Sequence, residues 1–456
     1  MKLQDLFNDK RFFRLLFTLA VPIMLQYLIN SLVNVLDTIM VGRLGTVAIA
    51  AVGLAVQIFF LYSVFIFGIC SGATIFAAQF WGKRDISGIR KTLGFSIILS
   101  LFWAVIFTLA ASIIPEKLIG FYSKDEAVVE TGAIYLRILS ISFIPFALTL
   151  AFTLSLRSIE RVRLTFVSTA ITLSVNVILT YIFIFGAGPI PAMGVRGAAW
   201  STVISRLLET VIILTVSYAK KYALAGSIRD LLRFDRVFIR QFIRISLPVM
   251  INEIFWSTGI TMQNAIFART NTDAIAAFNI TGTVSMLTWV LFIGLGNGAA
   301  VMIGKKIGEG DEKTAKEFAS KIAVVAPLLA AGAVFILFPL SRLLPFVFNV
   351  SPETLKTASQ MFIILCFVYP FRAFNMAMII GVCRAGGDTV FCILYDVANM
   401  WLIILPLAAL SAFVWQAPVW LIYLCVVSDD FLKMIFGIRR LKSGKWLNNV
   451  TTGLSP

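Results

Sequence analysis

The chain has 456 residues, of which 59% are hydrophobic and 14% are charged. Soluble domains average about 45–50% apolar and about 25% charged residues, so this chain has more apolar surface than a soluble core can bury. It also lacks histidine, which excludes histidine ligands, bases and proton relays. The net charge is +16, but the basic residues lie mainly in the loops between apolar segments. We therefore expect no nucleic acid partner.

Twelve apolar segments are long enough to cross a membrane as helices, because about 20 residues span the hydrocarbon. Their apolar runs are unbroken, whereas membrane strands alternate over about 10 residues. We therefore expect an all-α membrane protein. In chain order the predicted spans cover residues 13–41, 46–80, 91–114, 127–156, 164–187, 197–219, 238–268, 273–304, 317–343, 355–382, 389–413 and 418–438.

The basic residues fix an orientation for these spans. With the N-terminus placed in the cytoplasm, 29 of the 39 Lys and Arg residues fall in the tails and cytoplasmic loops, and 7 fall in the opposite loops. Cytoplasmic loops of membrane proteins carry such an excess. The pattern predicts a multi-pass protein of the cell (inner) membrane with both termini in the cytoplasm.

The sequence repeats itself at an offset of 226 residues. Laid without a gap, residues 22–85 match residues 248–311 in 16 of 64 columns, which include paired proline, arginine, glycine and aspartate. Each copy contains six spans, so both copies enter the membrane in the same direction. We expect two homologous six-helix bundles, related by a pseudo-two-fold axis along the membrane normal.

These considerations predict an N-terminal bundle at 1–219, a cytoplasmic surface linker at 220–237, and a C-terminal bundle with a short tail at 238–456. Near the linker, five arginines share one face of an expected helix over 221–244, and three phenylalanines form a second stripe. We expect this helix to lie on anionic headgroups. The two stripes are Arg229, Arg233, Arg236, Arg240 and Arg244, and Phe234, Phe238 and Phe242.

Glycine and proline mark special positions within the spans. The pairs Gly68–Gly72 and Gly294–Gly298 suit close helix contact in a membrane. Prolines in the first and fourth helix of each half remove a helix hydrogen bond, and are either hinges or fixed kinks. The hinge candidates are Pro22, Pro248, Pro145 and Pro370.

Three acids inside spans have no basic residue within one helical turn, namely Asp37, Glu253 and Asp396. Buried acids are costly and mark candidate functional sites. A carboxyl in apolar surroundings can carry a proton reversibly, and with oxygen ligands it can hold sodium. For Asp37, capping of a helix break is the alternative. By contrast, Arg206 with Glu209 and Asp430 with Lys433 are spaced as local i,i+3 pairs.

The sequence resembles the multidrug and toxic compound extrusion transporters over essentially its whole length. The resemblance implies export of bulky, often cationic and aromatic compounds in exchange for protons or sodium, by alternating access. The matching motifs are VLDTIMVGRLG at 35–45, GKRD at 82–85, GEGD at 308–311, CRAGGDT at 383–389 and RRLKSGKW at 439–446.

The resemblance also implies site residues in the N-terminal bundle. Asp37 matches the family's cation-binding acid, and Asn176 and Thr202 match its amide and hydroxyl partners. Thr180 stands where many relatives have a second acid. The site therefore has one negative charge fewer, which leaves its choice between proton and sodium open.

In the C-terminal bundle, Glu253 resembles in placement an acid that some relatives use for sodium, and Asp388 matches a second one. Asp388 is also placed to cap the eleventh helix. We assign Asp396 no counterpart.

We expect a secondary antiporter of organic compounds, and no enzyme. The proton or sodium ion would be its coupling ion, with no other cofactor or metal. Its partners would be small molecules and the lipid bilayer, and we expect a monomer. The alternatives are a flippase of lipid-linked oligosaccharides, which would carry more arginines inside its spans, an integral membrane enzyme and a channel.

Overall fold

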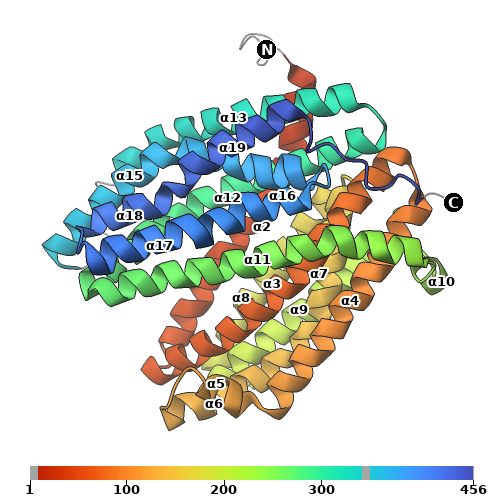
Figure 1. Ribbon diagram of the computed structural model, residues 1–456. Coiled ribbons are helices and arrows are strands. Elements are labelled where there is room, and N and C mark those ends of the chain that lie inside the picture. The colour runs from red at the N-terminus through yellow and green to blue at the C-terminus, as the bar shows by residue number, and fades with distance from the viewer. Residues whose placement is uncertain (1–8, 341–349, 455–456) are drawn as a thin grey trace. The chain divides into compact units, whose positions relative to one another are not determined.

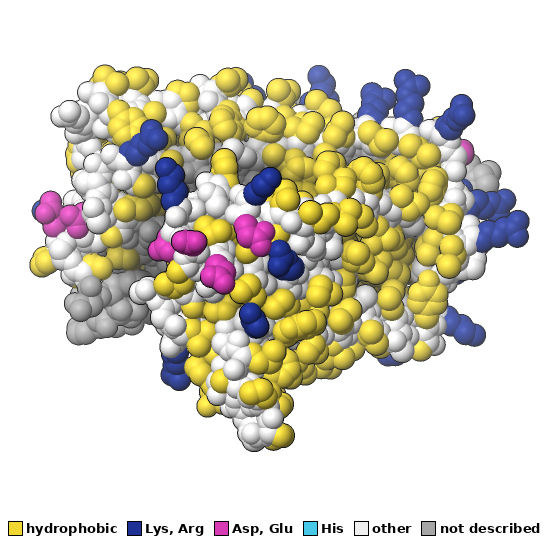
Figure 2. Space-filling model, turned by 90° about the horizontal axis from the view of Figure 1, so that it is seen from below, with side chains coloured by type: hydrophobic (Ala, Val, Ile, Leu, Met, Phe, Trp, Pro, Cys, Tyr) yellow, Lys and Arg dark blue, Asp and Glu magenta, His cyan; other side chains and the backbone are white. Residues whose placement is uncertain are grey.

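Every long element of the computed structural model is a helix (Figure 1). The structure describes residues 9–340 and 350–454. The chain ends lie outside these ranges, so the orientation of the termini stays a prediction. Exposed large hydrophobic side chains are numerous, and Figure 2 shows broad areas of hydrophobic side chains on the face in view. Such a surface suits contact with lipid.

The first half of the chain forms six long helical segments, the fourth of which joins α6, a 3-10 turn η1 and α7. Asp85 begins α4 by accepting a hydrogen bond from the Gly88 amide at 2.8 Å, and Asp125 caps α6 in the same way. The elements are α2 (Lys10–Gly42), α3 (Thr46–Lys83), α4 (Ile86–Ile113), α5 (Pro115–Gly120), α6 (Glu126–Leu139), η1 (Ser140–Ser142), α7 (Phe143–Ser158), α8 (Val162–Phe185) and α9 (Val195–Ala219).

The second half has the same order but contains π-helical segments, which insert extra residues into a helix. Pro370 lies inside α15, just before the π-helical η3, whereas Pro145 lies in the first turn of α7. The elements are α10 (Ile228–Leu231), α11 (Arg236–Thr270), α12 (Thr272–Gly308), α13 (Glu312–Leu340), α15 (Pro352–Met376), η3 (Ala377–Arg384), α16 (Thr389–Ile393), η4 (Leu394–Ala398), η5 (Met400–Ile404), α17 (Leu405–Ala409), η6 (Leu410–Val414), α18 (Val419–Val427) and α19 (Asp429–Ser443).

Ten helical segments of the described chain are long and apolar enough to cross a membrane. The predicted spans outside this set are 238–268 and 418–438. The first lies in α11, which is 35 residues long but rich in polar side chains. The second is divided between α18 and α19, and Asp429 and Asp430 stand at the junction.

The repeat also appears in contacts between corresponding positions. In the first half, the Tyr62 hydroxyl of α3 donates a hydrogen bond to the Phe143 carbonyl oxygen at 2.5 Å. In the second half, Thr288 of α12 donates to the hydroxyl of Tyr369. Both pairs of positions differ by 226 residues, so the repeat extends to the fourth helix of each half.

The chain divides into two compact units. One holds Leu247–Thr452 with the chain up to Met24, and the other holds Leu25–Ser246. The beginning of each repeat's first helix therefore packs within the other repeat's unit. The chain passes from one unit to the other within two residues of Pro22 in α2, and again within two residues of Pro248 in α11.

Glycines allow the beginnings of α2 and α11 to pack closely within these units. Gly72 of α3 lies against Ser246 of α11, so closely that a Cβ at Gly72 would stand 2.7 Å from the Ser246 Cα. Gly298 of α12 lies against Ala20 of α2, where a Cβ would stand 3.2 Å from the Ala20 Cβ. These two contacts are again related by the offset of 226.

We expect Gly72→Ala to destabilise the protein by about 1–3 kcal/mol, because the new methyl group meets backbone rather than a flexible side chain. Gly53→Ala, on the same helix, is the matched control, since a Cβ there meets nothing within 4 Å. It should be neutral or stabilising by up to about 1 kcal/mol. Thermal melting of the purified protein in detergent measures both. Equal melting temperatures for the two variants would contradict the close contact.

The linker differs from the single surface helix expected over 221–244. It contains the four-residue α10, after which α11 begins at Arg236. The two stripes face different ways, whereas the expected contact of the helix with anionic headgroups stays a prediction. The five arginines are exposed, whereas Phe238 and Phe242 are buried against Phe76 and Phe95. The apolar stripe thus holds the linker to α3 and α4.

Candidate functional site

Asp37 lies near the end of α2, inside the unit Leu25–Ser246. Its Oδ1 atom is buried and has no hydrogen-bond partner among the described residues. The Thr180 hydroxyl of α8 is within hydrogen-bonding reach of the carboxyl group, and Arg206 of α9 is close enough to interact with its charge. Asp37 is thus a partly buried acid whose inward oxygen has spare capacity for a proton or a cation.

The side chains around Asp37 come from α6, α8 and α9. Thr180 is buried and shares a 2.7 Å hydrogen bond with Ser201. Thr202 contacts Tyr135, and the charge of Asp37 also reaches Tyr135. The structure therefore brings Asp37, Thr180 and Thr202 into one neighbourhood. Buried Asn176 lies one helical turn before Thr180 on the same face of α8.

A relay of polar side chains runs through the interior of the same unit. Gln26 of α2 donates to the Thr169 hydroxyl at 2.6 Å, and this hydroxyl donates to Glu209 Oε1 at 2.8 Å. Glu209 Oε2 lies 3.3 Å from the guanidinium of Arg206, which confirms the local pair. At the other end, Arg157 donates to Gln26 Oε1 at 2.7 Å.

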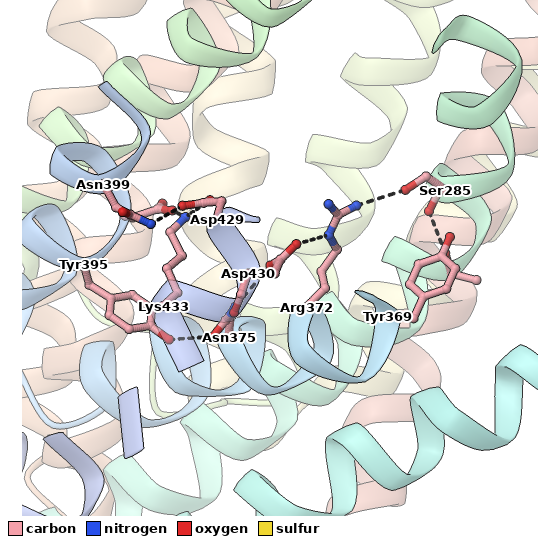
Figure 3. A network of polar contacts seen from close by, with 11 residues as sticks. Ser285, Tyr369, Arg372, Asn375, Tyr395, Asn399, Asp429, Asp430 and Lys433 are labelled. Carbon is pink, nitrogen blue, oxygen red and sulfur yellow. Dashed lines mark hydrogen bonds and ion pairs between the residues drawn. The ribbon is translucent and has the colours of Figure 1, made fainter. Parts of the chain in front are cut away.

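The unit containing Leu247–Thr452 has a corresponding relay. Asn252 of α11, which aligns with Gln26, donates to Asp396 Oδ2 at 3.2 Å. Lys433 of α19 lies 2.5 Å from both Asp396 Oδ1 and Asp429 Oδ2. Asp429 also accepts a hydrogen bond from Asn399. Figure 3 shows Lys433, Asp429 and Asn399 side by side.

The two relays have opposite polarity. In the first, an acid of the sixth helix lies between a hydroxyl group and an arginine. In the second, a lysine of the last helix lies between two acids. At the offset of 226 only Gln26 and Asn252 correspond, whereas Asp396 and Lys433 align with Ala170 and Leu207. The charged members of the two relays therefore stand at different positions of the repeat.

The acids predicted in the C-terminal bundle are paired with bases from other helices. Glu253 lies 2.5 Å from Arg384, and Asp396 is held by Lys433. Neither is therefore isolated, although neither has a base within its own helical turn. The bases that neutralise them are distant in sequence and could not be located from local spacing.

Asp388 stands at the N-cap position of α16, but its side chain makes no capping hydrogen bond. It instead accepts two hydrogen bonds from Arg440, at 2.6 and 2.8 Å. Asp388 therefore holds the expected N-cap position, but its side chain pairs with Arg440 and does not cap the helix. The bonds to Asp388 raise the pKa of the Arg440 guanidinium, so Arg440 stays charged at any physiological pH.

The local pair predicted between Asp430 and Lys433 is wrong. Asp430 lies 3.0 Å from Arg372 and accepts a hydrogen bond from Asn375 at 3.1 Å. Lys433 pairs with the neighbouring Asp429, one helical turn away at i,i+4. Asn375 also accepts a hydrogen bond from the Tyr395 hydroxyl at 2.7 Å (Figure 3).

The MatE family model matches residues 22–182 and again residues 248–410. The two matches begin 226 residues apart, in agreement with the internal repeat. This chain belongs to the MatE family.

Relatives of this MatE chain cover nearly all of its length. The uncharacterized transporter YisQ of Bacillus subtilis (strain 168) is 25% identical over 433 residues, which is 95% of this chain and 94% of that protein. The probable multidrug resistance protein NorM of Thermotoga maritima is 24% identical, with 94% and 92% covered. The chain is accordingly a multi-pass membrane transporter.

Solved structures show the same fold. A crystal structure described as MATE in complex with MaL6 has a TM-score of 0.85 at 20% identity, and covers 94% of this chain and 96% of that one. An outward-facing multidrug resistance MATE transporter has a TM-score of 0.84 at 19% identity, with the same coverage. The twelve-helix layout in two six-helix bundles is therefore the MatE fold.

Some neighbours of Asp37 in this MatE chain were missed by sequence reasoning. Tyr135 and Ser201 carry no signal beyond their type, because aromatic and hydroxyl side chains occur throughout the spans. Arg206 was assigned to its local pair with Glu209 alone. Its approach to Asp37 joins residues 169 positions apart, which sequence spacing does not encode.

Proposed function

We propose that the chain is a secondary antiporter that exports organic, often cationic compounds in exchange for protons or sodium. The observation that carries the proposal is Asp37, a partly buried acid whose Oδ1 has no partner among the described residues. A buried charge without full compensation favours uptake of a proton or cation. The multidrug names of several relatives support the substrate class.

Competition would couple the two fluxes. A drug cation and the coupling ion both neutralise Asp37, and each would favour a different state of the transporter. Thr180, Thr202 and Asn176 would supply oxygen ligands or hydrogen bonds to the bound ion. Alternating access would follow from bending near Pro22 and Pro248, where the chain passes from one unit to the other, with Pro145 and Pro370 as further hinges.

We propose an inner-membrane location with both termini in the cytoplasm, since bacterial relatives and the positions of the basic residues support it. A monomer suffices for this mechanism, because the Asp37 neighbourhood comes from one unit of one chain.

The test is dye transport by the purified protein in liposomes, first under a pH gradient without sodium and then under a sodium gradient at equal pH. We expect saturable flux under one of the two gradients. Flux that does not saturate would indicate a channel. Absence of dye flux under either gradient would contradict the antiporter and favour a flippase, for which a fluorescent lipid-linked sugar is the next substrate to test.

A further inference from the structure

Five acids of the unit Leu247–Thr452 expose 15% of their side chains or less and form ion pairs with four bases. One of these five acids therefore lacks a base of its own. Glu253, Asp388 and Asp430 each have a separate arginine. Asp396 and Asp429 share Lys433. The surplus negative charge therefore belongs to the cluster of Asp396, Asp429 and Lys433.

This cluster is closed off from water. Lys433 and Asp396 expose 6% and 8% of their side chains, and Asp429 exposes 14%. An uncompensated charge at such a place is strongly destabilising, so the cluster gains stability by taking up one positive charge. Within the described residues no group of three acidic, cysteine or histidine side chains is arranged to hold a metal ion.

Two amide groups provide a second, independent observation. Asn252 and Asn399 are more than nine-tenths buried, and each donates its Nδ2 hydrogen to a carboxylate of the cluster. Among the residues that the structure describes, the Oδ1 atom of each amide has no hydrogen-bond partner. Buried amide oxygens are rarely left unpaired. The two free oxygens therefore indicate a second state of the cluster, in which a carboxyl group is protonated and can donate a hydrogen bond to an amide oxygen.

We propose that this cluster binds a proton, held on Asp429. All four carboxylate oxygens of Asp396 and Asp429 are already engaged by Lys433 or by an amide N–H. A sodium ion would have to displace one of these groups. A proton needs only that Asn399 turns over, so that its Oδ1 accepts a hydrogen bond from the new O–H group on Asp429.

Asp429 is the acid of choice because other negative charges face it. Asp430 follows it on α19, and Asp396 lies across Lys433. The titratable and charged groups around the cluster come from α11, α15, η3, η4, α18 and α19, and are Glu253, Arg372, Arg384, Tyr395, Asp396, Tyr423, Asp430 and Lys433.

The test detects protonated carboxyl groups by infrared difference spectroscopy of the purified full chain. A protonated carboxyl group gives a carbonyl band that a carboxylate lacks. The protein carries Asp37→Asn, so that the N-terminal acid contributes nothing. We expect one carboxyl band that disappears at high pH. Asp429→Asn should remove it, because Asp396 and Lys433 are then balanced.

Adding Lys433→Met to Asp429→Asn should restore a band, now from Asp396, because one acid is again without a base. This double variant separates charge from structural damage, and an unchanged melting temperature confirms folding. Persistence of the band in Asp429→Asn would overturn the proposal. So would binding of radioactive sodium that Asp429→Asn abolishes, since sodium would then be the ligand.

The proton at Asp429 would be a second coupling ion only if the proposed antiport is correct. The spectroscopic test itself needs no transport. A failure of dye export would therefore leave the proton assignment intact, and loss of the band would leave coupling through Asp37 untouched.

Discussion

Replacing Asp37 by asparagine is expected to abolish gradient-driven export, while the protein still folds and inserts. The change removes the negative charge but keeps the shape, and Oδ1 makes no hydrogen bond to any described residue. Without the charge, neither a proton nor a cation has reason to bind at this position. Dye flux should fall to that of liposomes without protein, and cells that carry the variant should lose drug resistance.

Glu253→Gln is the comparison in the other unit. Arg384 lies 2.5 Å from Glu253 and neutralises it. Replacing Glu253 by glutamine should therefore lower the stability of the protein, but the same ion should still drive export. Normal export by Asp37→Asn would refute the role of Asp37. Sodium-driven export that fails only in Glu253→Gln would move the coupling site to the C-terminal unit and leave Asp37 as a drug contact.

The second large effect is expected from Arg384→Met, which should lower the free energy of unfolding by about 3–5 kcal/mol. Arg384 and Glu253 expose 9% and 15% of their side chains. Removal of the arginine leaves the Glu253 carboxylate buried without the base that it contacts. The apparent melting temperature of the purified protein in detergent measures the loss.

The double variant Arg384→Met with Glu253→Gln is the control for this interpretation. A buried ion pair can often be replaced by uncharged groups at little cost, so the double variant should recover most of the lost stability. If it is as unstable as Arg384→Met alone, the packing of the arginine side chain, and not the unpaired acid, explains the loss.

The all-helical membrane fold follows from the sequence by itself. A segment of about 20 apolar residues must be helical in lipid, because every backbone polar group needs a partner within the segment. The repeat is likewise visible at an offset of 226, and the family matches and the contacts at Tyr62 and Thr288 agree with it. Asp37 also stands out locally, since it is an acid without a neighbouring base in an apolar helix.

The tertiary structure alone decided which acids are neutralised. Glu253 and Asp396 have no base on their own turn, yet Arg384 and Lys433 reach them from other helices. Asp430 takes Arg372 in preference to the lysine three residues away. Charge pairing depends on distances between side chains in space, and these distances are set by how helices pack. A sequence states only the separations along one helix, so it identified Asp37 but could not distinguish it from acids that the fold had already paired.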